Sequence, residues 1–131
     1  MNNRFKFRVW DKMRLQFIYP HNDNQQHFII DLNGRFHNLQ NGSGGDDYVI
    51  QQYTGLSDSN DVPIYEGDIL KISYGAIGDV IGQVLYEADH GGYIFQWERK
   101  GPNQHHINLN CDVAFESVIV GNIFENKELL S

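Results

Sequence analysis

Hydrophobic and polar residues alternate along most of the chain, and turn-forming residues interrupt the alternation at short intervals. Side chains of a β-strand point alternately to its two faces, so this pattern predicts short strands joined by tight turns. Strands are expected at residues 4–10, 15–19, 28–32, 35–39, 48–54, 68–74, 80–87, 93–99 and 117–124. The predicted fold class is therefore mainly β.

The first third of the chain is predicted to fold as β-hairpins. Asp11-Lys12 supplies a short turn, and Asn33-Gly34 lies between two apolar segments. Asn-Gly is the strongest short-range hairpin signal, because both central residues of the tight turn must accept a positive φ. Residues 40–47 (QNGSGGDD) hold too few apolar groups to pack, so we interpret them as a flexible, Gly-rich linker.

The segment Glu66-Gly67-Asp68 begins the part of the chain that we expect to form a barrel. Gly67 can take the positive φ of a sharp turn, and the alternation after it makes Leu70, Ile72 and Tyr74 the predicted core stripe. A turn glycine followed by Asp and an alternating strand is typical of SH3-like barrels, and Gly-rich turns then predict a meander of three strands. We therefore predict a partly open SH3-like β-barrel with N-terminal β-hairpins and at most short helical turns.

The C-terminal part carries several local signals. Residues 105–110 fit either a short strand or an irregular crossover, and residues 113–116 fit one helical turn. Gly121 interrupts the side-chain packing of the last strand, so a bulge or a close backbone approach is expected there. We expect Leu129-Leu130 to pack back on the protein or to meet a neighbouring subunit.

Length and composition predict one soluble domain over residues 1–131, because 131 residues suit a single core and 40% of them are hydrophobic. The expected parts are an N-terminal hairpin lobe over 1–39, the linker over 40–47, a barrel core over 48–124 and a tail over 125–131. No apolar run approaches the roughly 18 residues of a membrane span, and no signal peptide is evident. A cytoplasmic location without membrane contact is therefore expected.

The formal net charge of −7 bears on the choice of partners. Binding to nucleic acid rests on Lys and Arg, and the basic candidates are Arg4, Lys6 and Arg8, which alternate with apolar residues and would share one strand face. We favour the interpretation that this face is solvated and covers a buried aromatic face. A phosphate-binding face is the alternative.

Catalytic chemistry has few candidates. Glu66 and Asp68 lie two residues apart and could serve acid–base chemistry, but such a pair more often caps a turn, with Asp68 accepting backbone N–H bonds. Cys111 could pair with His105 or His106, but a lone cysteine in a β protein is usually a small buried hydrophobe. We therefore assign no catalytic residue.

Metal sites and cofactors are not expected either. The six histidines are scattered, and no pair has the usual ligand spacing with a second pair to match it. Residues 57–61 resemble a calcium loop, but Val62 stands where a third oxygen ligand would be needed and Pro63 follows it. We interpret that segment as a turn.

Aromatic residues are numerous enough to line a binding face, although most will be core. The set comprises Tyr53, Tyr65, Tyr74, Tyr86, Tyr93 and Trp97. The candidate binding residues are Tyr53, Tyr65, Glu66 and Asp68.

Three blocks of the sequence resemble the YopX family, small proteins encoded by phages and prophages of bacteria. The blocks are residues 6–12 (KFRVWDK), 52–70 (QYTGLSDSNDVPIYEGDIL) and 119–130 (IVGNIFENKELL). Asn60-Asp61 stands where the family usually has Asn-Gly, and Lys127 stands where it usually has Pro. The resemblance implies a mostly β fold and a phage-genome setting, and it supplies no reaction and no catalytic residues.

These observations together favour a non-catalytic interaction module that acts on a host or phage protein in the bacterial cytoplasm. Exposed strand edges in the N-terminal lobe would also favour a homo-oligomer, since unpaired edges invite pairing. A nucleic-acid-binding barrel that uses the N-terminal Arg/Lys face is the first alternative. A small hydrolase built around Glu66 and Asp68 or Cys111 is the second.

Overall fold

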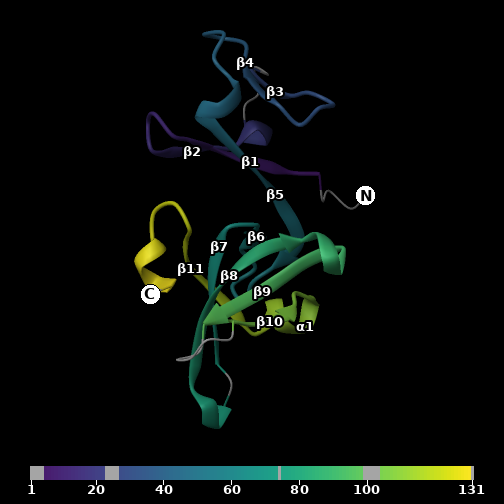
Figure 1. Ribbon diagram of the computed structural model, residues 1–131, viewed down its shortest axis with the longest axis vertical. Coiled ribbons are helices and arrows are strands. Elements are labelled where there is room, and N and C mark those ends of the chain that lie inside the picture. Colours follow the sequence, from purple (N-terminus) through teal and green to yellow (C-terminus); the bar gives the residue numbers. More distant parts are fainter. Residues whose placement is uncertain (1–4, 23–26, 74, 99–103, 131) are drawn as a thin grey trace. The chain divides into compact units, whose positions relative to one another are not determined.

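The computed structural model describes residues 5–22, 27–73, 75–98 and 104–130 of the chain (Figure 1). These residues form mainly β-strands, with one short α-helix and several 3-10 turns among them, so the predicted fold class is confirmed. The chain divides into two compact units, Asn3–Tyr53 and Thr54–Ser131. That the whole chain forms one domain remains a prediction.

The first unit contains two small antiparallel sheets. In one sheet, β1 (Phe7–Asp11) pairs with β2 (Gln16–Ile18) on one side and with the first half of β5 (Tyr48–Ser57) on the other. In the other sheet, β3 (Phe28–Ile30) pairs with β4 (Phe36–Asn38). Both N-terminal hairpins expected from the sequence are therefore present.

The β3–β4 turn differs from the predicted one. Gly34 takes a positive φ of 76°, but Asn33 is not among the residues with positive φ. The Asp31 carboxylate closes the turn instead, because its Oδ1 accepts the N–H groups of Asn33 (2.9 Å) and Arg35 (3.0 Å). Its Oδ2 lies 2.9 Å from His37 Nε2, and the hydrogen bond with His37 is the largest cause that lowers the pKa of Asp31.

Residues 40–47, the expected linker, fold back on β4. The Asn38 N–H donates to the Ser43 carbonyl (2.8 Å), and Gly44 forms an isolated bridge with His37. A 3-10 turn, η2 (Gly45–Asp47), then leads into β5. These residues lie inside the first compact unit, and the division between the units falls after Tyr53.

The second unit is built on one five-stranded antiparallel sheet that curls into a half-barrel (Figure 1). The strand order is β10-β9-β8-β7-β11, so the last strand pairs with the first strand of the meander. The strands are β7 (Asp68–Ser73), β8 (Asp79–Glu87), β9 (Gly92–Glu98), β10 (Gln104–Asn108) and β11 (Ser117–Asn122). The predicted meander is confirmed.

Shorter elements complete the second unit. A strand that the sequence did not indicate, β6 (Pro63–Tyr65), lies next to β5, and the Thr54 hydroxyl donates to the Ile64 carbonyl (2.8 Å). The helical turn expected near residue 113 is α1 (Cys111–Phe115), which begins earlier because the Asn110 side chain caps it by accepting the Val113 N–H.

The expected bulge at Gly121 is present, because the register with β7 shifts between Ile119 and Gly121. A Cβ atom at Gly121 would lie 2.5 Å from Asn126 Oδ1, so the close approach of this side chain requires glycine. The tail then forms η5 (Lys127–Leu130), which lies against β8. Leu129 is nevertheless exposed, so whether Leu129-Leu130 packs back on the protein or meets a neighbouring subunit remains a prediction.

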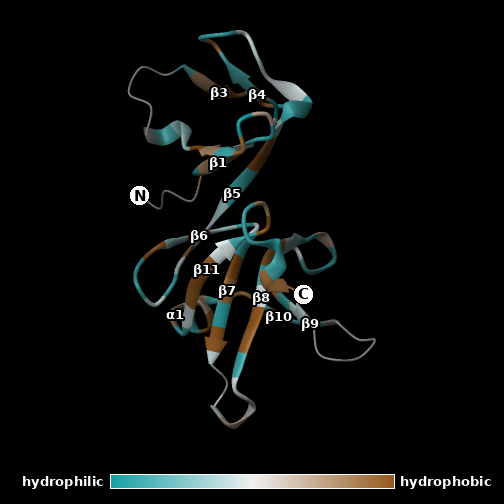
Figure 2. Ribbon diagram, turned by 90° about the vertical axis from the view of Figure 1, so that its left-hand side faces the viewer, coloured by the Kyte–Doolittle hydropathy of each residue, from teal (hydrophilic) through white to brown (hydrophobic). Residues whose placement is uncertain are grey.

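The core of the second unit lies on the concave face of the curled sheet. Hydrophobic and hydrophilic residues alternate along β7 and β8, as the brown and teal bands show (Figure 2). Leu70 and Ile72 are buried, as the alternation predicted, whereas Tyr74 lies outside the described residues. Ile69, on the opposite face of β7, is buried as well. The cluster consists of Ile64, Leu70, Ile72, Val84, Phe95 and Ala114.

Candidate functional site

The Glu66-Gly67-Asp68 turn holds two of the four candidate binding residues, Glu66 and Asp68, and a third candidate, Tyr65, directly precedes it. Asp68 is buried, and its Oδ2 accepts the Tyr65 N–H at 2.8 Å, as expected for a turn cap. Gly67 takes a φ of 84°, and its N–H donates to the Val84 carbonyl (2.7 Å). Tyr65 is also buried, so this turn offers solvent mainly the half-buried Glu66.

Aromatic side chains follow the concave face of β9 and its neighbours. Phe95 stacks on Trp97 with ring centroids 5.4 Å apart, and Trp97 stacks on His105 at 5.9 Å. Tyr93 packs against the core cluster, and its ring meets the ring of Tyr86 edge to face at 5.5 Å. The shared face of Tyr93, Phe95 and Trp97 is therefore the core face of the sheet.

Tyr86 and Tyr93 form the end of this aromatic row that reaches solvent. They are direct partners in the β8–β9 register, and Tyr86 is 53% exposed. The pKa of Tyr93 is raised to about 12. Burial is the largest cause, the charge of Glu66 is the second and Tyr86 is the third. The neutral hydroxyl therefore persists well beyond physiological pH. Sequence patterns placed both tyrosines only in a larger aromatic set.

Among the described N-terminal basic residues, Arg8 does not lie on the expected solvated face. Arg8 is only 5% exposed, its Nε donates to Gln51 Oε1 (2.8 Å), and its guanidinium lies 4.3 Å from the Phe17 ring centroid. Lys6 Nζ lies 5.8 Å from the ring centroid of Tyr53, the fourth candidate binding residue. Arg4 lies outside the described residues. The prediction of a solvated basic face is thus wrong for Arg8, whose charge is held by an amide and an aromatic ring.

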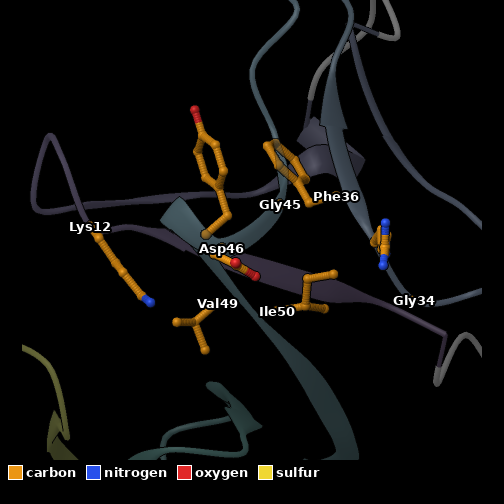
Figure 3. A pocket seen from close by; sticks show the side chains of 9 residues that line it. Lys12, Gly34, Phe36, Gly45, Asp46, Val49 and Ile50 are labelled. Carbon is orange, nitrogen blue, oxygen red and sulfur yellow. The ribbon is translucent and has the colours of Figure 1, made fainter.

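A pocket of about 690 Å³ lies within the first unit (Figure 3). Phe36, Val49 and Ile50 supply apolar walls, while Lys12 and Arg35 add two positive charges and Asp46 adds one negative charge. The Tyr48 hydroxyl, from another lining residue, lies 2.8 Å from Ser43 Oγ. Charges of both signs therefore line the pocket beside its apolar walls.

Residues 57–61, which resemble a calcium loop, form the turn that was expected. Asp58 is buried, and its Oδ1 accepts the N–H groups of Asn60 and Val62, both at 2.9 Å. Its Oδ2 accepts the Ile119 N–H (3.0 Å) and so ties the turn to β11. Asp61 adopts a φ of 62°, so Asp does tolerate the position where the family usually has Gly. The sequence signal for this structural role was the Asp58-Ser59-Asn60 run.

The hydrolase candidates are not brought together as a reactive group. Asp68 accepts a backbone N–H, and Cys111 stands at the start of α1. The expectation of a buried cysteine is wrong, because Cys111 follows the exposed cap Asn110 and is itself exposed. Among the described residues, no three His, Cys, Asp or Glu side chains are grouped to hold a metal ion. Within the same ranges, no helix has the length and hydrophobicity to span a bilayer.

Comparison with known proteins places this arrangement in a family. The chain is similar to the protein of the "Crystal structure of protein EF1440 from Enterococcus faecalis", with 26% sequence identity and a TM-score of 0.59. That similarity covers 96% of this chain and 97% of the other one. No curated protein matches the chain. The family described as YopX protein matches residues 6–131, nearly the whole sequence. The chain therefore belongs to the YopX family.

Proposed function

We propose that the chain is a non-catalytic protein-interaction module of phage or prophage type that works in the cytoplasm of a bacterial host. In this proposal the first unit joins copies of the chain to one another, and the oligomer acts on a host or phage protein. Membership in the YopX family supports this proposal, because the resemblance to that family implies a phage or prophage genome.

The observation that carries the proposal is the apolar surface of the first unit. Among its described residues, only three hydrophobic side chains are buried: Val9, Trp10 and Phe36. More large hydrophobic side chains are exposed than buried, namely Phe5, Met13, Leu15, Tyr19, Ile29, Leu32 and Leu39. Exposed hydrophobic side chains that gather into one patch mark interaction sites, and we propose that these side chains do so.

A second copy of the chain is the partner that the charges favour for this surface. Residues 3–53 carry six Lys or Arg and five Asp or Glu, a net charge of +1, whereas residues 54–131 carry four and twelve, a net charge of −8. Two second units would repel each other, but two first units would not. The edge strands of the first unit add backbone groups that can pair across an interface.

The finer assignment of the second unit as a partly open SH3-like barrel has support from its topology. Four strands form a meander, a short helix follows them, and the last strand pairs with the first. Barrels of this size present their loops and rims to partners while the core stays closed.

Nucleic-acid binding is the less supported alternative. It requires an exposed basic face, and Arg8, one of its three members, is buried against Gln51 and Phe17. A filter-binding assay at low salt that retained nucleic acid, and lost it on Lys6→Ser substitution, would revive this alternative.

The test of the proposal is the molar mass of the full chain in solution, measured by light scattering after size exclusion at micromolar to submillimolar concentrations. We expect an oligomer for the native chain and a monomer for the variant Met13→Ser/Leu32→Ser/Leu39→Ser. These three side chains are exposed, so their loss removes apolar contact area without opening a cavity.

The matched control is Val62→Ser/Ile81→Ser/Phe115→Ser, which removes three exposed hydrophobic side chains from the second unit. We expect this control to keep the molar mass of the native chain. A native chain that stays monomeric over the whole concentration range, or a control that dissociates as completely as the first variant, would contradict the proposal.

A further inference from the structure

The aromatic row of the second unit does not end inside the core. Alternation along β8 places Tyr86 on the same face as the buried Val84, yet more than half of the Tyr86 side chain is exposed. Tyr93, opposite it on β9, packs against the core cluster and fixes the edge-to-face geometry of the pair. The two rings therefore form one aromatic surface near the β8–β9 turn of the curled sheet.

A carboxylate lies near the same pair of rings. The hydrogen bond from the Gly67 N–H to the Val84 carbonyl sets the Glu66-Gly67 turn beside β8, two residues before Tyr86. The charge of Glu66 acts on the Tyr93 hydroxyl, since it is one of the causes that raise the pKa of Tyr93.

We propose that Tyr86, Tyr93 and Glu66 form a recognition site for a positively charged side chain, arginine or lysine, within a basic segment of a partner protein. The faces of tyrosine rings attract cations, and a neighbouring carboxylate adds a charge-assisted hydrogen bond. Arginine is the better fit of the two, because its planar guanidinium can stack on one ring while donating to a carboxylate.

The charge of the second unit favours a basic protein segment over other occupants. Its net charge of −8 attracts cationic chains and accelerates their association. The same charge repels the phosphates of nucleic acids and of anionic lipids. The inference rests on the proposed role as an interaction module and names the chemistry of the partner that the second unit takes.

The test is a calorimetric titration of the full chain with a short Gly-Ser peptide that carries several arginines. A matched peptide with glutamine in place of each arginine is the ligand control. We expect the arginine peptide to bind, with an affinity that falls as salt rises, and the glutamine peptide not to bind. Equal binding of the two peptides, or no binding of the arginine peptide at low salt, would overturn the site.

Variants locate the site on the chain. Tyr86→Ala should weaken binding of the arginine peptide about tenfold, whereas Tyr86→Phe should keep it, because phenylalanine preserves the aromatic face. Glu66→Gln should also weaken binding and flatten its salt dependence. Phe115→Ala, which removes an exposed aromatic side chain at the end of α1, is the matched control and should bind as the native chain does. Native binding by Tyr86→Ala would contradict the assignment.

Light scattering of the same samples separates this inference from the proposed function. A chain that self-associates but does not bind the arginine peptide leaves the interaction module standing and removes the Tyr86 site. A chain that stays monomeric but binds the arginine peptide through Tyr86 contradicts self-association and supports the recognition site.

Discussion

The second unit covers Ile64, Leu70 and Phe95 within its own curled sheet, whereas the first unit leaves Met13 and Leu32 in contact with solvent. The two units also differ in charge, with −8 on the second and +1 on the first. An acidic unit with a closed core can stay folded and dispersed alone. A nearly neutral unit with exposed apolar side chains has less charge to oppose self-association. We therefore propose two tasks in one chain, assembly for the first unit and recognition for the second.

The comparison predicts its largest effect in the core of the second unit. Leu70→Ala should lower the free energy of unfolding by about 3 kcal/mol, because Leu70 is fully buried and its truncation leaves a cavity. Urea unfolding followed by tryptophan fluorescence measures the change. Lys71→Ala on the same strand is exposed and should change it by less than about 0.5 kcal/mol. A Leu70→Ala loss as small as the control loss would mean that the second unit has no closed core.

The Asp58 turn should give the next largest effect. Asp58→Ala should cost about 2 kcal/mol in the free energy of unfolding, because three backbone N–H groups lose their acceptor. Asp58→Asn keeps one side-chain oxygen and should lose less. Asp79→Ala, which removes an exposed carboxylate of the same unit, serves as the control. Equal stability of Asp58→Ala and the control would contradict a structural role for this carboxylate.

Alkaline pH should destabilise the second unit through Tyr93. Its pKa is raised to about 12 in the folded protein, above the usual 10.0, so folding favours the neutral hydroxyl. The stabilisation is fully present below pH 10 and is lost as the pH rises toward 12. Because Tyr93 is only half-buried, the loss should reach about 1 kcal/mol at most.

Denaturant unfolding at pH 9 and pH 11 measures the alkaline effect. Tyr93→Phe should lose less stability between these two pH values than the native chain, while Tyr19→Phe should lose as much as the native chain. The same pH-dependent loss in all three proteins would show that Tyr93 is not the group responsible.

Exposed leucine in the first unit should give the smallest effect on stability. Leu32→Ser should change the free energy of unfolding of the dilute chain by less than about 0.5 kcal/mol, because the Leu32 side chain is fully exposed. Comparison of this loss of stability with that of Leu70→Ala shows how differently a leucine contributes to the stability of the two units. A loss above about 2 kcal/mol would place Leu32 in a core.

The strands were predictable because alternation is a local signal. The hairpins, the meander and the bulge at Gly121 all follow from residues that are near one another in the sequence. The turn after Asp31 was less predictable, because the carboxylate competes with the Asn-Gly signal for the same backbone donors. Local patterns do not rank such competing interactions.

The candidate site was less accessible from sequence, because its contacts join distant residues. Arg8 is buried by Gln51, which follows 43 residues later, and no local pattern reveals that pairing. Tyr86 and Tyr93 are neighbours because the β8–β9 turn sets the register of the two strands. The sequence would have predicted this pair only if the length of that turn had been known. Cys111 is exposed because the cap at Asn110 starts α1 there. The roles of Tyr53, Tyr65, Glu66 and Asp68 in binding remain predictions.

The most direct test of the division of tasks is hydrogen–deuterium exchange at low and high protein concentration. We predict that protection rises with concentration in peptides around Met13, Leu32 and Leu39, while peptides from β7 to β11 exchange at the same rate in both samples. Concentration-dependent protection confined to the second unit, or none at all, would contradict assembly through the first unit.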